Sequence, residues 1–579
     1  MSDREALVRG YQAGCLLEVI QSAISADDRE RTKLVSDLVT LHNESVIDLL
    51  EAFGALTREA DDGPEFFMLR HIFEEALPDL EAPVPKLIRT VVHLYQEAGS
   101  DLAAGTILSA IEGFYSKSAD RPRAALAEIE ANAQILVDLL VTTLISGSAG
   151  DPSFFVDETI RLCGDTNVEI RKRALYSLGR LRGGLDHASN EAIARTLEHV
   201  VAAEDDEGIL ASALSSAFEL SRQPAADQSR FVPIIEGALA KGGDTALHAA
   251  AQIFGFQTSK LSPELLEIFL DRLADVKPAN LGTLESVDYG IAHLLQSDSV
   301  EAGLGFLEKL LRTNPENLDF SIFNDAVRTI RHSPALRNKV VTRWLLQGDP
   351  ILCRGLEKII DSRMGDSPEL EADAAELAGG EPARLLFAAR KVIGYLFLKS
   401  VSASSFVLSL ARHAPNDSIR SELGDLLLNP LLLNFSGALS EYLNGRAETE
   451  PAEVRTVIRR ALEHLQSYLE DLKSVGDIPA LHPSLEHRDA YHRHISKEMA
   501  RSFEKAKAES VLLQLLPQSV LLYGRKAIHH AFGPEGEVSR METQMGSLGT
   551  NFEQARMTIV DPLWLDFMLS VFRHERMVT

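Results

Sequence analysis

Four histidines near the C-terminal end are the side chains whose types and spacing come closest to a chemical site. The stretch contains His482, His487, His492 and His494, with Asp489 and Glu498 beside them. His494 and Glu498 are four residues apart, so on a helix they face the same way, as metal ligands sometimes do. His492 aligns with neither His487 nor His494, and a metal site needs three or more converging ligands. We interpret the stretch as the solvated or hydrogen-bonded start of a helix, with metal binding as the less favoured alternative.

No motif of catalysis accompanies these histidines. The sequence contains no P-loop, no glycine fingerprint after a strand, no glycine-rich elbow of serine hydrolases and no His-Glu-x-x-His pattern. An enzyme built on this chain would have to assemble scattered residues. We therefore expect no catalytic residue, no metal and no cofactor. A metal-dependent enzyme that uses the histidines of 482–498 is the least favoured hypothesis.

The composition describes a folded and strongly acidic protein. Hydrophobic residues make up 45% of the 579 residues and charged residues 25%, which are ordinary values for globular proteins. The chain is too long for one compact core, so several domains or one elongated stack are expected. Its formal charge of −27 repels phosphate backbones on average and favours partners with a basic surface. A general nucleic-acid coat is disfavoured.

Cysteine usage and apolar runs indicate a cytoplasmic protein. Cys15, Cys163 and Cys353 lie far apart in apolar stretches, so we expect buried thiols rather than disulfides or a zinc site. The first residues contain neither the basic nor the apolar segment of a secretion signal. The longest apolar runs, 135–145 and 511–523, are too short or too interrupted to span a bilayer. We expect no membrane partner.

Almost every segment repeats its apolar residues with a period near 3.6, as amphipathic helices do. The pattern is clear at 34–50, 87–95, 129–145, 454–472 and 510–522. Leu and Ala recur throughout while aromatic residues make up only 6%, which favours helices over sheets. Alternating strand patterns bounded by Asn-Gly or Asp-Gly turns are absent. Short connections between the runs suit antiparallel helix pairs.

Units with a shared layout recur in the middle of the chain. They cover residues 164–181, 204–220, 242–255 and 348–360. Each opens on a turn with an acidic residue, namely Asp165, Asp206, Asp244 or Asp349. An Asp in that place can cap the following helix by accepting hydrogen bonds from its free N–H groups. Asp165 and Asp206 are 41 residues apart, and Asp206 and Asp244 are 38 apart.

The first unit resembles a HEAT or armadillo-type repeat, in which a turn carries an Asp and the second helix has a Val/Ile-Arg pair followed by spaced Ala and Leu. The matching residues are Asp165, Ile170, Arg171, Ala174, Leu178 and Leu181. The second unit matches less well, at Asp206, Ile209, Ala213 and Ala217, and the third matches loosely. The resemblance covers about residues 150–360, and the spacing falls within the range of such repeats. It implies an all-α fold, an elongated α-solenoid of stacked antiparallel helix pairs, with N- and C-terminal parts that could be distinct helical regions.

Basic residues gather in two places. The first contains Arg171, Lys172, Arg173, Arg180 and Arg182. The resemblance implies that Arg171 bonds to a turn Asp of a neighbouring repeat and that second helices line a groove, so we name Arg173, Arg180 and Arg182 as candidate partner-binding residues. The second place is 485–531, where basic residues outnumber acidic ones. Within it, charges of alternating sign lie at helical spacing at Glu498, Arg501, Glu504, Lys505 and Glu509. That alternation indicates a solvated helix with ion pairs rather than a phosphate-binding stripe.

Changes of composition divide the chain into an N-terminal helical region (1–150), a HEAT-like region (151–363), an acidic linker (364–382) and a C-terminal helical region (383–579). The linker carries six acidic residues and no basic one, so we expect a solvated loop or frayed helix. Glycines predict a second loop at 533–550. A last helix at about 552–575, with Trp564 and Phe567, is expected to cap the stack or, less favoured, to dock on a partner.

These features favour a non-catalytic scaffold or adaptor that binds a protein partner along the solenoid surface. One alternative is a solenoid that holds nucleic acid in a basic groove, which requires Arg173, Arg180 and Arg182 to converge with the basic residues of 488–526. The metal-dependent enzyme is the other. The identity of the partner and the oligomeric state stay open.

Overall fold

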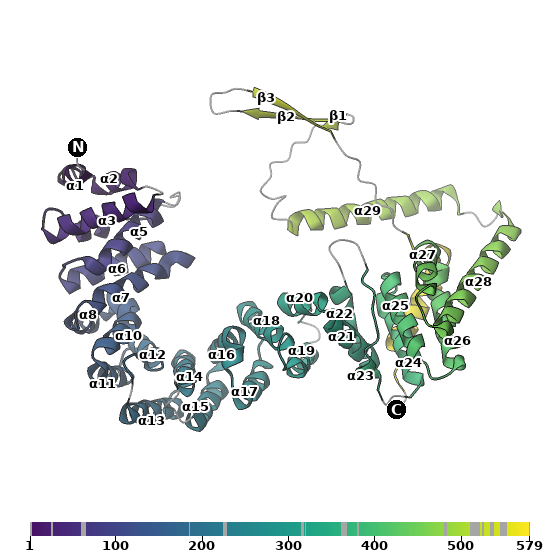
Figure 1. The fold of residues 1–579 in the computed structure, drawn as a ribbon, viewed down its shortest axis with the longest axis horizontal. Coiled ribbons are helices and arrows are strands. Elements are labelled where there is room, and N and C mark those ends of the chain that lie inside the picture. The colour runs from purple at the N-terminus through teal and green to yellow at the C-terminus, as the bar shows by residue number, and fades with distance from the viewer. Residues whose placement is uncertain are drawn as a thin grey trace. The chain divides into compact units, whose positions relative to one another are not determined.

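A computed structural model gives the fold of the chain (Figure 1). The residues that it describes are 3–24, 27–58, 65–184, 186–223, 228–313, 318, 320–360, 367–378, 381–476, 478–479, 483–509, 522–523, 526–532, 538–544 and 553–577. The chain forms two compact units, Met1–Thr329 and Ile330–Thr579. The sequence boundary expected at 150/151 falls inside the first unit.

All the regular secondary structure among the described residues of unit 1 is helical. Its α-helices are α1 (Asp3–Gln12), α2 (Leu16–Ala23), α3 (Asp28–Asn43), α4 (Leu49–Gly54), α5 (Glu65–Ala76), α6 (Val84–Ala98), α7 (Thr106–Ser116), α8 (Asp120–Ala131), α9 (Ala133–Leu136), α10 (Leu140–Gly150), α11 (Pro152–Leu162), α12 (Val168–Leu178), α13 (His187–Ala203), α14 (Glu207–Ser221), α15 (Gln228–Lys241), α16 (Gly243–Gln257), α17 (Pro263–Leu273), α18 (Leu281–Leu295) and α19 (Val300–Thr313). Short 3₁₀ turns are η1 (Leu77–Asp79), η2 (Leu102–Gly105), η3 (Val137–Leu139), η4 (Thr258–Lys260) and η5 (Phe320–Ile322).

Unit 2 follows α20 (Asn324–His332), which spans the division between the units. Its helices are α21 (Pro334–Gln347), α22 (Pro350–Ile360), α23 (Ala374–Leu377), α24 (Ala383–Leu396), α25 (Ser400–His413), α26 (Asp417–Leu426), the π-helical turn η6 (Leu427–Leu432), α27 (Ser436–Ala447), α28 (Ala452–Val475), α29 (Leu485–Glu509), α31 (Met557–Val560) and α32 (Pro562–His574). Its strands are β1 (Leu522–Tyr523), β2 (Lys526–Phe532) and β3 (Val538–Gln544).

The helices of unit 1 form two rows. α12, α14, α16 and α18 pack side by side in chain order, and α11, α13, α15 and α17 do the same (Figure 1). Their contacts use small and aliphatic side chains; on α14, Ala213, Leu214, Ala217 and Phe218 are fully buried. A single helix pair cannot cover its own apolar faces, so stacking supplies the continuous core. The predicted all-α, HEAT-like helical solenoid is confirmed.

Glycines let helices of one row approach closely. A Cβ on Gly255 of α16 would lie 2.5 Å from the main-chain oxygen of Ser286 on α18, and one on Gly179, just after α12, would lie 2.6 Å from the Cα of Ser216 on α14. Both obstacles are backbone atoms, which cannot rotate away. A glycine therefore allows a close helix crossing at two places in the row formed by α12, α14, α16 and α18.

Two of the four predicted aspartate caps are present. Asp206 accepts a hydrogen bond from Ile209 N at 2.9 Å and caps α14, and Asp349 accepts one from Ile351 N at 3.0 Å at the start of α22. The prediction was wrong for Asp165, because Asn167 lies closer to α12 and is its cap. It was also wrong for Asp244, which lies inside α16 and pairs with Lys277.

A buried carboxylate takes over the capping role at α20. Asp288 of α18 is 3% exposed and accepts hydrogen bonds from the backbone N–H groups of Asp325 and Ala326, at 2.7 and 2.9 Å. Burial raises the pKa of Asp288 to about 6. These hydrogen bonds connect α18 to the N-terminus of α20.

The raised pKa of Asp288 predicts a gain of stability on mild acidification. Between the unfolded pKa near 4 and the folded pKa near 6, the folded state binds the proton more tightly, so its stability falls as pH rises through that window. The free energy of unfolding of the wild type should gain about 1 kcal/mol from this group between roughly pH 7 and pH 5. Urea unfolding of Asp288→Asn, which keeps an acceptor without a titrating proton, should lack that increment; an equal gain in both proteins would contradict the assignment.

The acidic stretch at 364–382 differs from the solvated loop that its charges predict. Its backbone is pinned between α21 and α25: Leu370 N and Ala372 N donate to Ser405 Oγ and Ser409 Oγ, both at 2.8 Å. Asp373 N donates to Thr342 Oγ1 at 2.9 Å on the other side. Leu370 and Ala372 are buried, so residues 367–378 are packed as part of unit 2.

The described residues of unit 2 also contain a small antiparallel sheet beside the helices. β2 pairs with β1 and β3, and Phe532 lies opposite Val538 in the register of β2 and β3. The predicted helix at 510–522 and loop at 533–550 fall mostly outside the described residues. The sequence did not predict this hairpin, because residues 533–537 are Gly-Pro-Glu-Gly-Glu. This stretch contains neither the Asn-Gly nor the Asp-Gly pair that is typical of a tight hairpin turn.

Ala133–Gly150 is the one described segment that is long and apolar enough to cross a membrane, with a mean hydropathy of 1.4. It forms α9, η3 and α10 in succession, and α10 packs against α7, α8, α11 and α12. A helix with neighbours on several sides needs apolar residues around most of its circumference. Its composition is thus explained by its place in the stack.

Candidate partner-binding surfaces

Many basic side chains of unit 1 bind acids about one repeat away, and we call these contacts the inter-repeat ion pairs. They include Arg89–Glu128 at 2.6 Å, Arg171–Glu204 at 2.5 Å, Arg230–Glu198 at 2.9 Å, Lys277–Asp244 at 2.8 Å and Lys309–Asp271 at 2.8 Å. The partners are 32 to 39 residues apart in the chain. The expected link from Arg171 to a neighbouring turn exists, with Glu204 in place of an Asp. Cations used in this way hold the stack together.

The three candidate partner-binding arginines have different surroundings. Arg173 of α12 binds Glu169 Oε2 at 2.6 Å and Asp138 Oδ1 at 2.7 Å and is 25% exposed. Arg182 is 53% exposed but binds Glu112 Oε2 at 3.0 Å. Arg180 stacks on Tyr176, with its guanidinium carbon 3.6 Å from the ring centroid, and donates to Tyr176 O. Two of the three charges are balanced by acids, so this group does not form the open basic groove that a nucleic acid requires. Their role in partner binding stays a prediction.

The histidine-rich stretch lies on α29 and its N-terminal approach. His487, His492 and His494 are on exposed turns of this helix, and His482 lies outside the described residues. Among the described residues no group of three or more His, Cys, Asp or Glu side chains is placed to hold a metal ion. Arg501 pairs with Glu498 at 2.5 Å, so an exposed helix with an ion pair is present over Leu485–Glu509. The stretch of basic residues expected up to 531 is not helical at its end, because β2 covers Lys526–Phe532.

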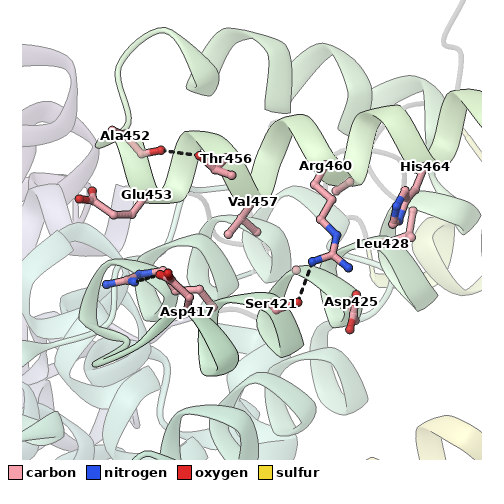
Figure 2. A pocket seen from close by; sticks show the side chains of 13 residues that line it. Asp417, Ser421, Asp425, Leu428, Ala452, Glu453, Thr456, Val457, Arg460 and His464 are labelled. Carbon is pink, nitrogen blue, oxygen red and sulfur yellow. Dashed lines mark hydrogen bonds and ion pairs between the residues drawn. The ribbon is translucent and has the colours of Figure 1, made fainter.

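A groove of about 430 Å³ runs between α26 and α28 in unit 2 (Figure 2). Its floor is apolar and is made of Gly424, Leu428, Val457 and Ala461. A Cβ on Gly424 would lie 2.9 Å from Val457 Cγ1, so this glycine lets the two helices approach at the floor. Arg460 reaches from α28 across the groove and donates to Ser421 Oγ of α26 at 2.9 Å (Figure 2).

The groove carries an excess of negative charge. Arg420 binds Asp417 at 2.6 Å, which balances that pair. Asp425 on α26 and Glu453 on α28 also line the groove, and neither has a hydrogen-bond or ion-pair partner among the described side chains. Arg460 is the remaining cation. An apolar floor between uncompensated carboxylates suits a ligand that combines apolar and cationic groups.

A buried carboxylate fixes the helices beside this groove. Glu450, just before α28, is 1% exposed in its side chain and accepts from Arg412 Nε and Nη2 of α25, both at 2.8 Å. Arg446 Nη2 of α27 donates to the same carboxylate at 2.6 Å. Arg412 also binds Glu371 at 2.7 Å, which extends the link to the packed acidic stretch. Hydrogen bonds from Arg412 hold the pKa of Glu450 below its usual value.

The last helix packs on α24 through one face, and its two expected roles, capping the stack or docking on a partner, stay predictions. Leu565 and Leu569 of α32 are buried, and α32 packs on α24, where Lys391 Nζ donates to Arg573 O at 2.6 Å. Its other face remains uncovered: Trp564 is 53% and Phe567 59% exposed. Phe552, at the start of the range expected for this helix, lies outside the described residues.

The solved structures that are similar to this chain share little of its sequence. A scan against family models and a search of curated proteins give no match. Similar solved structures include importin beta in an ammonium sulfate condition, at 12% identity and a TM-score of 0.30, covering 83% of this chain and 71% of that one. An engineered protein (14% identity, 80% and 99% covered, TM-score 0.18) and a circular tandem repeat protein (12% identity, 82% and 97% covered, TM-score 0.15) are also similar.

Proposed function

We propose that the chain is a non-catalytic scaffold of the cytoplasm that binds a protein partner, and that the groove between α26 and α28 receives a segment of that partner. The observation that carries the proposal is the apolar floor of this groove between the uncompensated carboxylates of Asp425 and Glu453. The partner segment is one that places an apolar side chain next to Lys or Arg. The surrounding field of a chain with charge −27 favours the approach of such a segment.

The groove has a size and chemistry that match this task. A volume of about 430 Å³ lies in the range of pockets that enclose a few side chains. The helices on both sides are fixed by packing and by the Glu450 network, so little ordering is needed on binding. No catalytic group is required for this function.

Selection of peptides from a random library on the immobilised chain tests the proposal. Selected peptides should carry Lys or Arg beside Leu, Ile or Phe. Asp425→Lys with Glu453→Lys should weaken their binding by at least tenfold, because the change replaces attraction by repulsion at both walls. A matched control is Glu422→Lys with Glu463→Lys, which changes the same net charge on exposed positions of the same two helices outside the groove. Equal binding by the two double variants would overturn the proposal.

A further inference from the structure

Four neighbouring helices of unit 1 each carry an aromatic residue that is followed four positions later by a basic one. The aromatic residues lie on α12, α14, α16 and α18, and the pairs are Tyr176 and Arg180, Phe218 and Arg222, Phe256 and Lys260, and Tyr289 and His293. Side chains four positions apart lie next to each other on a helix. In the first two pairs the guanidinium carbon lies over the ring, 3.6 and 5.5 Å from its centroid. The cation is held there by the negative charge density of the ring face.

The rings of the last two pairs have no cation over them among the described residues. Lys260 donates instead to Gln257 Oε1 at 3.3 Å. Phe256 is 65% and Tyr289 49% exposed, and their ring centroids lie 5.7 Å apart. Because α16 and α18 pack side by side, the two rings form one exposed aromatic surface (Figure 1). In this respect the surface differs from the rings on α12 and α14, which a guanidinium of the chain covers.

Two polar side chains lie one helical turn from these rings. Glu285 precedes Tyr289 by four residues on α18; it is exposed and has no hydrogen-bond or ion-pair partner among the described residues. Gln252 precedes Phe256 by four residues on α16, and its Nε2 lies 3.2 Å from Nε2 of His248. That contact uses the amide nitrogen of Gln252, so the amide oxygen remains as an acceptor. The exposed rings are thus accompanied by an uncompensated carboxylate and an amide oxygen.

We infer that the surface formed by Gln252, Phe256, Glu285 and Tyr289, here called the aromatic patch, binds an arginine side chain of a protein partner. A planar guanidinium can stack on a ring while the N–H groups at its edge donate to a carboxylate and an amide oxygen. A compact ammonium has no flat face to stack, and an apolar side chain would bury Glu285 without a partner. The stacked guanidinium beside α12 shows that this chain already uses such a contact. The patch belongs to unit 1, and its ligand is independent of the groove in unit 2.

Fluorine NMR of the full chain tests the aromatic patch with a single arginine. A trifluoromethyl label is attached to Ser259→Cys, three residues after Phe256, in a Cys15→Ser background that removes the one cysteine that is not buried. The probe is the peptide acetyl-Gly-Ser-Arg-Ser-Gly-amide, and the matched peptide carries citrulline, which has nearly the same shape without the charge. We expect a saturable shift of the fluorine signal with arginine, at an affinity at least fivefold higher than with citrulline. Equal shifts with both peptides, or no shift, would overturn the inference.

Variants of the labelled chain assign the binding to the aromatic patch. Phe256→Leu with Tyr289→Leu keeps apolar surface and charge but removes the ring faces, and should weaken arginine binding at least fivefold. Glu285→Gln should weaken it at least threefold, whereas the matched control Glu267→Gln, at an exposed position of α17 outside the patch, should leave it unchanged. Binding that survives the loss of both rings, or that falls equally in the two glutamine variants, contradicts the assignment. Peptides selected at the groove of unit 2 report on the other proposal, so either proposal can fail alone.

Discussion

Gly255→Ala should destabilise unit 1 by about 2–3 kcal/mol, although alanine is the better helix former. The added Cβ would lie 2.5 Å from the main-chain oxygen of Ser286, so α16 and α18 must move apart and lose contacts along the row. The same substitution at Gly305 of α19 should stabilise the protein by about 0.5–1 kcal/mol, because no atom lies within 4 Å of the new Cβ. Chemical unfolding followed by circular dichroism measures both.

The comparison is informative because the two variants make one chemical change in two helix interiors. Helix propensity alone gives both the same sign. If the free energy of unfolding falls for Gly255→Ala and rises for Gly305→Ala, the difference must come from the close crossing of α16 and α18. Two stabilised variants would contradict the close crossing of α16 and α18 at Gly255.

Glu450→Ala should destabilise unit 2 by about 2–4 kcal/mol, since it leaves Arg412 and Arg446 without the carboxylate that they share. The two guanidiniums are 25% and 30% exposed and regain some water, which keeps the loss below that of a fully buried triad. Glu450→Gln keeps an acceptor of the same shape and should lose less. Urea unfolding of both variants beside the wild type measures the difference.

The pKa of Glu450 adds a pH signature to this prediction. Because the folded-state pKa lies below the unfolded one, the carboxylate stabilises the fold above the unfolded pKa, and that stabilisation is lost as pH falls through the folded pKa. The stability gap between wild type and Glu450→Gln should therefore narrow on acidification below about pH 4.5. A gap that stays constant down to pH 3 would mean that the Glu450 charge contributes nothing.

The solenoid could be predicted because its signals are local and repeated. The 3.6-residue period is the same in every helix, the Asp206 cap lies within one turn of the N–H group that it binds, and Arg171 sits at a recurring place in its repeat. Even for these local signals, a difference of two positions in the sequence decided which residue caps a helix. Asp165 precedes α12 by three residues while Asn167 precedes it by one, and the nearer residue is the cap.

The candidate site could not be predicted, because the residues that contact one another there are far apart in the sequence. Glu169 lies only four residues before Arg173. The other acids that bind Arg173 and Arg182, namely Asp138 and Glu112, lie 35 and 70 residues upstream, and no spacing in the sequence connects them. The groove depends on how closely Gly424 lets α26 approach Val457 in a region without a clear repeat. The acidic stretch was misjudged because its charges are visible in the sequence, whereas the Ser and Thr hydroxyls that bind its backbone lie on α21 and α25. The net charge predicts a partner with a basic surface but indicates no place on this chain where it would bind.

The reach of the inter-repeat ion pairs sets how far a disturbance travels. Each ion pair joins a repeat to its immediate neighbour. Local unfolding of one repeat therefore breaks ion pairs to the adjacent repeat directly and affects more distant repeats only indirectly. Mechanical strain and local melting are consequently shared among few helices at a time. A body built in this way can yield in one section, as a ligand is accommodated, while distant sections keep their structure.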